Sequence, residues 1–383
     1  SGGGFGNAVG AAGPGAAAKA GAGGGARSGG FGNAVGAAGP GAAAKAGAGG
    51  GARSGGFRRI IGAVGLSPAG LAALALGLAV VGTIDDEYYI RLLTTALMYG
   101  VLAMAFDFTS GYINIVNFGF AAFWGLGAYV TGCLAWHLGW SPWQGLLPAV
   151  GAAAALGLLL GLLTIRLGGI FAACMTWFVA MAMLSVASNW VGMTRGATGL
   201  TIPLLFRSEA NLPYLIAVVI IAVFSYFVLS RIIRSKAGLA FQAIGQDIEA
   251  AAISGINANY YKIMNFTISC AFAGFLGWFF AHYVGVLTPQ TLHTRATVEI
   301  MVISYIGGRG SLWGGLAAAL LIIPAMEQIK SIQALSDMME LRLVLYGVLM
   351  IVVMIYYPGG LSGLVKALAQ KFGLAGWVSA EKR

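Results

Sequence analysis

The sequence predicts an all-α fold: a polytopic helical membrane protein of about 10 transmembrane segments, including a broken helix, with a disordered Gly/Ala-rich N-terminal tail. Of the 383 residues, 58% are hydrophobic and 9% are charged, and the mean hydropathy is +0.84. Soluble domains carry about 25% charged residues. So few charges cannot cover a water-facing surface, so lipid is the expected solvent. Apolar runs of about 20 residues, long enough to cross a bilayer, recur along the chain.

Residues 1–57 form the predicted tail. The segment from Gly6 to Phe31 recurs without change from Gly32 to Phe57, and it consists mostly of Gly and Ala. Such a repeat has little apolar surface to offset the entropy lost on ordering. We therefore expect a disordered low-complexity tail, a transmembrane domain over residues 58–365, and a short cytoplasmic C-terminal tail over residues 366–383.

The transmembrane domain divides into ten apolar segments. We place them at 62–84, 89–108, 115–136, 144–165, 170–190, 212–230, 263–285, 296–306, 312–329 and 341–357. The eighth is too short to cross a bilayer alone and is followed by IGGRGSLWGG. The sequence therefore predicts that 296–329 is one helix broken at a glycine turn. Broken helices are tolerated at membrane depth where they pack in protein or line a cavity.

The distribution of Lys and Arg predicts the orientation. With the N-terminus inside, the inside loops hold Arg53, Arg58, Arg59, Arg166, Arg231, Arg234, Lys236, Lys262, Arg309, Lys366, Lys371, Lys382 and Arg383. The outside loops and their edges hold fewer: Arg91, Arg195, Arg207, Arg295, Lys330 and Arg342. The positive-inside rule therefore places both termini in the cytoplasm. The net charge of +10 is scattered between apolar runs, without the basic face of a nucleic-acid-binding protein.

One polar stretch interrupts the apolar sequence. Residues 244–262, IGQDIEAAAISGINANYYK, have the alternation of a surface helix and lie in the longest predicted cytoplasmic loop, from Arg231 to Lys262. Within it, Glu249-Ala250-Ala251 is followed by Gly255, which can end a helix with a positive φ. The pattern alone allows an ordinary amphipathic surface helix or a small-residue face that another protein approaches closely.

The surroundings of this stretch carry a resemblance to a known family. SKAGLAFQAIGQDIEAAAISGINANYYKIMNF resembles the cytoplasmic loop of permease subunits of ABC importers, and more narrowly the LivM type of branched-chain amino acid transporters. Further similar stretches follow in the family's order. They are GYINIVNFGFAAFWGLGAYV (111–130), TIRLGGIFAACMTWFVAM (164–181), TRGATGLTIP (194–203), YIGGRGSLWGG (305–315) and YPGGLSGL (357–364). NIVNFGF is closer to the partner permease type.

The resemblance implies a transport subunit of the bacterial inner membrane. It implies four partner chains: a second, LivH-like permease, two ATP-binding cassette subunits, and a periplasmic substrate-binding protein. The coupling surface for the ATPase would consist of Asp247, Glu249, Ala250, Ala251 and Gly255. The chain has no G-x-x-x-x-G-K-[ST] motif. We therefore expect no cofactor on this chain, with ATP bound by the partner subunits.

A candidate substrate pathway follows from polar groups and glycines within or near the spans. These are Asn114, Asn117, Thr176, Glu299, Gly307, Gly308 and Gly310. Glu299 lies in the short half-helix and could meet the ammonium of an amino acid, or pair with Arg295 one turn earlier. Asn114 and Asn117 could contact the substrate or cap the third segment. We expect Asp107 and Glu327 to be interfacial.

Other classes of function find less support. The three His residues lack metal-ligand spacing, no Ser/His/Asp order or HExxH motif indicates an enzyme, and the three Cys lie in apolar segments. The leading hypothesis is the permease of an ATP-driven importer of branched-chain or related amino acids. The alternatives are an ion-coupled secondary transporter, which is also built from broken helices, or an ABC permease for urea, amides or aromatic acids.

Overall fold

The computed structural model describes residues 86–164, 167, 170–206 and 211–330, with a few single positions between 344 and 363. The elements in chain order are α3 (Glu87–Ser110), α4 (Phe120–Leu138), α5 (Leu146–Thr164), α6 (Ile170–Asn189), α7 (Val191–Thr194), η1 (Gly196–Thr198), β1 (Leu200–Thr201), α8 (Leu212–Ile233), α9 (Lys236–Gln246), α10 (Ile248–Ile253), α11 (Ala258–Val284), β2 (Val286–Leu287), η2 (Pro289–Leu292), α12 (Thr294–Gly307) and α13 (Leu312–Lys330). The predicted N-terminal tail, the first span at 62–84 and the C-terminal tail lie outside the described residues, as does most of the tenth span.

The described helices agree with a multi-pass membrane protein. α3, α5, α6, α8 and α11 are each long and apolar enough to cross a bilayer. α12 and α13 meet at a bend of 113° and pass the same test as a pair. The predicted broken helix is therefore confirmed. α4 has the length of a span, but it carries Gly, Trp, Tyr and His among its apolar residues and is not one of the five.

α3 lies at the centre of the described bundle. It packs against α8, α11, α12 and α13, and most of its residues from Ala96 onward are buried. Small residues let the helices approach: a side chain on Gly277 of α11 would clash with the backbone of Trp124 in α4, and one on Gly127 would clash with Gly274. Packing through small residues is the ordinary way for helices to associate in lipid, where no hydrophobic force drives them together.

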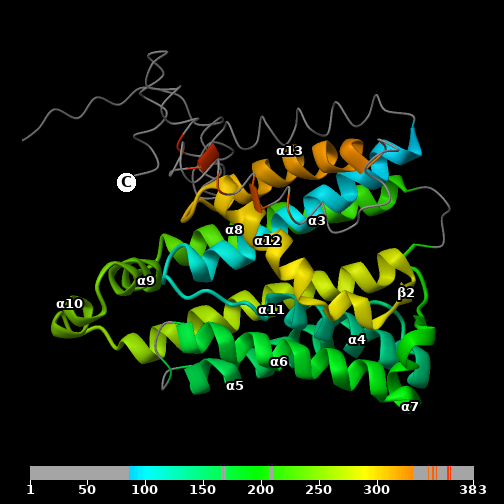
Figure 1. Cartoon of the computed structure of the whole chain (residues 1–383), viewed down its shortest axis with the longest axis horizontal. Helices are drawn as coiled ribbons and strands as arrows, with labels where there is room; N and C mark the ends of the chain where they lie inside the picture. Colours follow the sequence, from blue (N-terminus) through cyan, green and yellow to red (C-terminus); the bar gives the residue numbers. More distant parts are fainter. Residues whose placement is uncertain are drawn as a thin grey trace, which may run out of the picture. The chain divides into compact units, whose positions relative to one another are not determined.

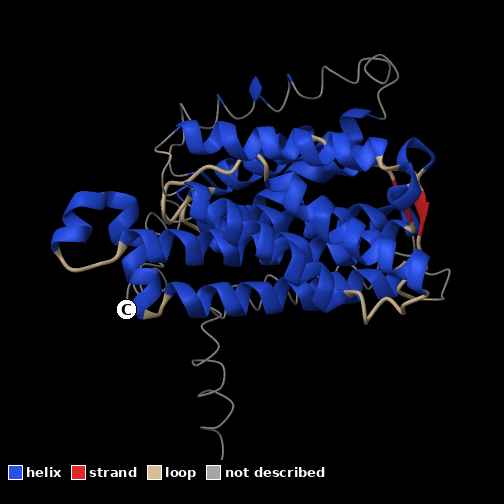
Figure 2. Ribbon diagram, turned by 90° about the horizontal axis from the view of Figure 1, so that it is seen from below, coloured by secondary structure: helices blue, strands red, loops and turns tan. Residues whose placement is uncertain are grey.

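The bundle has two different ends. α9 and α10 lie at one end, and α7 and β2 lie at the other (Figure 1). β1 and β2 form a two-residue antiparallel pair, Leu200 with Leu287 and Thr201 with Val286. This pair lies at the end opposite α9 and α10 (Figure 2). This arrangement matches the predicted alternation, in which the 231–262 loop and the loop before α8 lie on opposite sides of the membrane.

The third predicted span begins later than its sequence suggests. We expected the helix from residue 115, but α4 begins at Phe120, and residues 111–119 are a turn followed by irregular chain. Asn114 has a left-handed φ of 63°, which a helix start does not accommodate. A non-helical link between α3 and α4 thus contains the two polar residues Asn114 and Asn117, together with Gly119.

Candidate functional site

The polar loop between α8 and α11 folds as two helices and not as the single surface helix that its alternation suggests. α9 ends at Gln246, and Asp247 takes an extended conformation with φ −153° and ψ 115°. The Asp247 carboxylate accepts from the backbone N–H groups of Glu249 and Ala250 at 2.8 and 3.1 Å. Asp247 is therefore the N-cap of α10, because its side chain supplies acceptors for the unpaired first N–H groups.

The short helix α10 presents most of the predicted coupling residues. Asp247, Glu249 and Ala250 are exposed, whereas Ala251 is buried. Gly255 has a φ of +81° and follows the last turn, so the predicted helix end is confirmed. No atom lies within 4 Å of the place where a Gly255 side chain would begin. The motif thus forms an open, capped turn at the end of the bundle.

α9 contacts the link between α3 and α4 at a single glycine. A side chain on Gly245 would clash with the carbonyl of Tyr112, so only a residue without Cβ allows this approach. The Asn114 side-chain amide donates to the Gly245 carbonyl at 2.8 Å. Asn114 therefore fixes the 111–119 segment to the helix that leads into the predicted coupling residues.

The same asparagine contacts the glycine turn of the broken helix. Nη2 of Arg309 donates to the Asn114 side-chain oxygen, and to the Ser110 carbonyl at 3.0 Å. The Arg309 guanidinium also lies over the ring of Tyr305, 5.3 Å from its centre. The glycine turn and the 231–262 loop thus lie at the same end of the bundle, as the sequence predicted.

The turn itself needs the glycines that the sequence singled out. Gly308 and Gly310 have φ values of +105° and +75°, which residues with a side chain rarely adopt. Gly307 packs against the backbone of Gly314 so closely that a Cβ would clash with it. These contacts bring the start of α13 directly against the end of α12.

Asp107 is buried inside the protein near the end of its span. It is 1% exposed, and its Oδ1 accepts from the Gly310 N–H at 3.0 Å. Its expected place at the membrane interface stays a prediction. A side chain on Gly111 would clash with both Asp107 and Gly310. The carboxylate is thus held in the crossing between α3 and the glycine turn.

The predicted pathway residues Asn117 and Thr176 both lie beside Gly119 at the start of α4. Asn117 Oδ1 accepts from the Gly119 N–H at 3.0 Å, and Thr297 Oγ1 of α12 accepts from the Ala121 N–H at 2.8 Å. A Gly119 side chain would clash with the Thr176 carbonyl. Asn117 thus bonds to the N-cap residue just before α4 and does not cap the helix itself, and its contact with the substrate stays a prediction. Three segments far apart in sequence therefore converge on one helix start.

Glu299 pairs with Arg295, which is one of the two roles that the sequence left open for it. Oε1 of Glu299 lies 3.7 Å from Nε of Arg295, in an i, i+4 pair on α12, and Glu299 is 5% exposed. The pairing gives the buried carboxylate a partner of opposite charge.

Sequence reasoning missed polar residues that tie helices together elsewhere. His282 of α11 is fully buried between Thr131 Oγ1, at 2.9 Å, and the Pro203 carbonyl, at 2.7 Å. Asn265 and Ser269 of the same helix donate to the α3 carbonyls of Phe108 and Ala105. A polar residue in an apolar run was the available signal, but its partner cannot be read from the run.

Comparison with known proteins identifies the family. Residues 88–354 match the family described as branched-chain amino acid transport system / permease component. The chain belongs to this family. It is therefore a permease component of a transport system, and the match includes α10, the glycine turn and the 111–119 link.

Individual relatives agree with the family. The high-affinity branched-chain amino acid transport system permease protein LivM of Escherichia coli is 28% identical over 310 residues, covering 73% of this chain and 70% of the relative. The LivH permease protein of the same system in Escherichia coli is 24% identical over 290 residues, covering 70% and 92%. The fructose import permease protein FrcC of Rhizobium meliloti is 30% identical over 112 residues, covering 28% and 30%. No solved structure matches the chain.

Proposed function

We propose that this chain is one of two permease subunits of an ATP-driven importer in the bacterial inner membrane, with branched-chain or related amino acids as cargo. Relatives named LivM and LivH both match it, which supports a second, LivH-like permease as partner. Two ATP-binding cassette subunits and a periplasmic substrate-binding protein complete the proposed assembly. ATP would bind to the partner subunits, and this chain would carry no catalytic activity.

The observation that carries the proposal is the bridge that Asn114 forms between the end of α9 and the glycine turn of the broken helix. Asn114 bonds to Gly245 at the end of α9 and to Arg309 in the glycine turn. An ATPase that moved α10 would therefore act on the turn through two hydrogen bonds, without passing through the bundle core. A two-state element biased from one end is the ordinary physical basis of such coupling.

The surface of α10 fits the docking role. Ile253 is 88% exposed and Ile248 is 47% exposed, so a short helix at the end of the bundle presents apolar side chains beside the exposed Glu249. An apolar centre with a charged rim is the usual anatomy of a protein interface. On this proposal the α9–α10 end faces the cytoplasm, together with both termini.

The pathway would use the helix start where α4, α6 and α12 converge. Asn117, Thr176 and Glu299 lie on or beside these elements, and Gly307, Gly308 and Gly310 form the adjoining turn. Non-helical backbone inside a membrane domain is tolerated where it is buried or lines a cavity. Movement of the turn would then change the packing around this helix start.

Uptake by the reconstituted complex tests the function. Vesicles that hold this chain, its LivH-like partner, the two ATPases and the binding protein should accumulate radiolabelled leucine only with internal ATP. An ionophore should leave uptake unchanged. Uptake that follows an ion gradient without ATP would support a secondary transporter, and uptake of urea or an aromatic acid without leucine would reassign the cargo.

Substitution of Gly255 tests the docking role. Gly255→Trp should prevent co-purification of the ATPase, because bulk and strain replace an open glycine that ends α10. Gly139→Trp is the matched control, since Gly139 also ends a helix with positive φ, +64°, and has no atom within 4 Å of its Cβ position. Gly139 follows the last residue of α4, at the end of the bundle opposite α9 and α10, so the ATPase should remain bound. Equal ATPase recovery with both variants would contradict docking at α10.

A further inference from the structure

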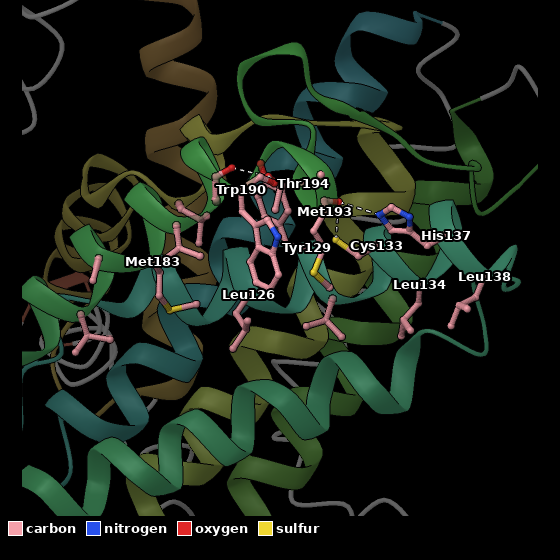
Figure 3. Close-up of a pocket in the computed structure, with 17 residues that line it drawn as sticks. Leu126, Tyr129, Cys133, Leu134, His137, Leu138, Met183, Trp190, Met193 and Thr194 are labelled. Carbon is pink, nitrogen blue, oxygen red and sulfur yellow. Dashed lines mark hydrogen bonds between the residues drawn. The ribbon is translucent and has the colours of Figure 1, made fainter.

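A groove lies between α4 and α6 at the end of the bundle opposite α9 and α10. Its volume is about 730 Å³, and α7 and Leu292 of η2 complete its lining. The residues from α4 run from Leu126 to Leu138 at helical spacing (Figure 3), those from α6 run from Val179 to Ala187, and Trp190 precedes α7. α4 and α6 touch at Gly119 and Thr176, whereas toward α7 their facing stripes are separated by the groove.

The groove has the chemistry of a hydrocarbon site. Most of its lining side chains are Leu, Val, Ala and Met. The polar groups near α7 bond to one another: the Met193 carbonyl lies 3.1 Å from His137 Nε2 and 3.6 Å from Cys133 Sγ, and Thr194 Oγ1 donates to the Ala187 carbonyl (Figure 3). A polar occupant would find few free partners on these walls.

The length of the groove matches one leaflet of a bilayer. The stripe from Leu126 to Leu138 rises about 18 Å at about 1.5 Å per residue. Half of a ~30 Å hydrocarbon core is about 15 Å. A free amino acid is much shorter than this stripe, whereas a lipid acyl chain spans one leaflet by construction.

A cation directly follows the α7 residues that line the groove. Arg195 is the residue after Thr194, is exposed, and places its guanidinium 4.8 Å from the ring centre of Trp136; Arg195 and Trp136 are not themselves lining residues. Within the described part of the chain, no carboxylate forms an ion pair with Arg195. Exposed tryptophans gather at this end, as is typical of a membrane–water boundary. They are Trp136, Trp140, Trp143 and Trp190.

We propose that this groove binds an anionic phospholipid, with one acyl chain between α4 and α6 and the phosphate at Arg195. The guanidinium offers a planar, charged donor set that suits a phosphate. The lipid would hold α4 and α6 apart at this end, and so set the packing of two helices whose other ends meet at the proposed pathway. The inference goes beyond the transport function and does not depend on the identity of the cargo.

Lipid counting on the purified complex tests the proposal. The complex is exchanged into detergent containing phosphatidylglycerol, and bound lipid is measured by native mass spectrometry. Ala182→Phe places a ring in the groove and should lower lipid occupancy about tenfold. Ala155→Phe is the matched control, because Ala155 is exposed on α5 outside the groove, and it should bind lipid as the parent does.

The headgroup contact is tested at Arg195. Arg195→Gln should weaken phosphatidylglycerol binding about tenfold through loss of the charge-assisted contact, and Arg195→Lys should retain part of it. Binding that is unchanged by both Ala182→Phe and Arg195→Gln would overturn the proposal. So would equal binding of phosphatidylglycerol and an uncharged diacylglycerol.

A photoreactive benzophenone side chain at position 182 identifies the occupant directly. A phosphatidylglycerol adduct supports the proposal. An adduct with the second permease subunit would overturn it and make the groove a subunit interface. The Tyr129 hydroxyl is buried without a partner among the described residues and could favour a polar cargo. Leucine is therefore added as competitor, and loss of the adduct in its presence would assign the groove to the substrate instead.

Discussion

The two ends of the bundle are packed in opposite ways. At the α9–α10 end, Gly245, Gly111 and Gly310 allow three backbone segments to cross where any side chain on Gly245 or Gly111 would clash. At the α7 end, α4 and α6 leave an apolar groove of about 730 Å³ between them. Hydropathy separates the polar α9–α10 segment from the apolar spans, but it does not show where backbones cross closely and where a groove remains.

The difference shows where movement can be transmitted. A close-packed backbone crossing transmits a displacement, because its contacts leave little free volume to absorb it. The groove can change its width between α4 and α6 when its occupant changes, since the hydrogen bonds between its walls join α4 to α7 at one end. We therefore expect the glycine crossing to transmit motion and the groove to accommodate it.

The largest expected effect follows from breaking the crossing. Gly245→Val should reduce ATP-dependent uptake by at least about tenfold, because the new side chain pushes α9 from the Tyr112 carbonyl, at an overpacking cost of about 1–3 kcal/mol. Gly151→Val on α5 is the control, since no atom lies within 4 Å of its Cβ position. Uptake by vesicles of matched protein content measures both. Normal uptake with Gly245→Val would show that the crossing is not needed.

A smaller effect is expected when the hydrogen bonds at the glycine crossing are removed while its backbone segments stay in place. Asn114→Ala and Arg309→Gln should each lower the uptake per ATP hydrolysed, and the double variant should be no worse than the stronger single one. A coupling energy of about 0.5–3 kcal/mol is expected for residues in one network. Asn189→Ala is the control, because Asn189 bonds only within α6 in the described structure. Additive losses would show that Asn114 and Arg309 act separately.

The smallest effect is expected from labelling the two ends, which should leave uptake intact. Ile253→Cys in α10 and Leu138→Cys at the end of α4 replace side chains that are 88% and 60% exposed. A membrane-impermeant thiol reagent should reach Cys at position 253 only from the cytoplasmic side, and at position 138 only from outside, with the parent protein as background. Labelling in the reverse sense would overturn the proposed orientation.

The sequence was enough to predict the architecture of the described region. Long apolar runs must become helices in lipid, because each backbone polar group needs a partner within its own segment. The break between α12 and α13 was predictable because IGGRGSLWGG combines glycines with a charge that lipid excludes. The end of α10 at Gly255 was predictable for a similar local reason, since glycine adopts positive φ at little cost. Local patterns predicted the start of α4 at residue 115, whereas the helix begins at Phe120 after the irregular 111–119 segment.

The candidate site depended on contacts that the sequence does not carry. Asn114 lies 131 residues from Gly245 and 195 from Arg309, and nothing in the apolar runs between them specifies that these groups meet. The sequence places Asp107 near the end of a span, and its burial comes from the packing of the glycine turn against α3. The sequence by itself determined which segments enter the membrane and where the chain breaks, because solvation and backbone conformation act locally. The tertiary structure alone decided which polar groups meet and where a groove remains, because these depend on how closely helices distant in sequence approach.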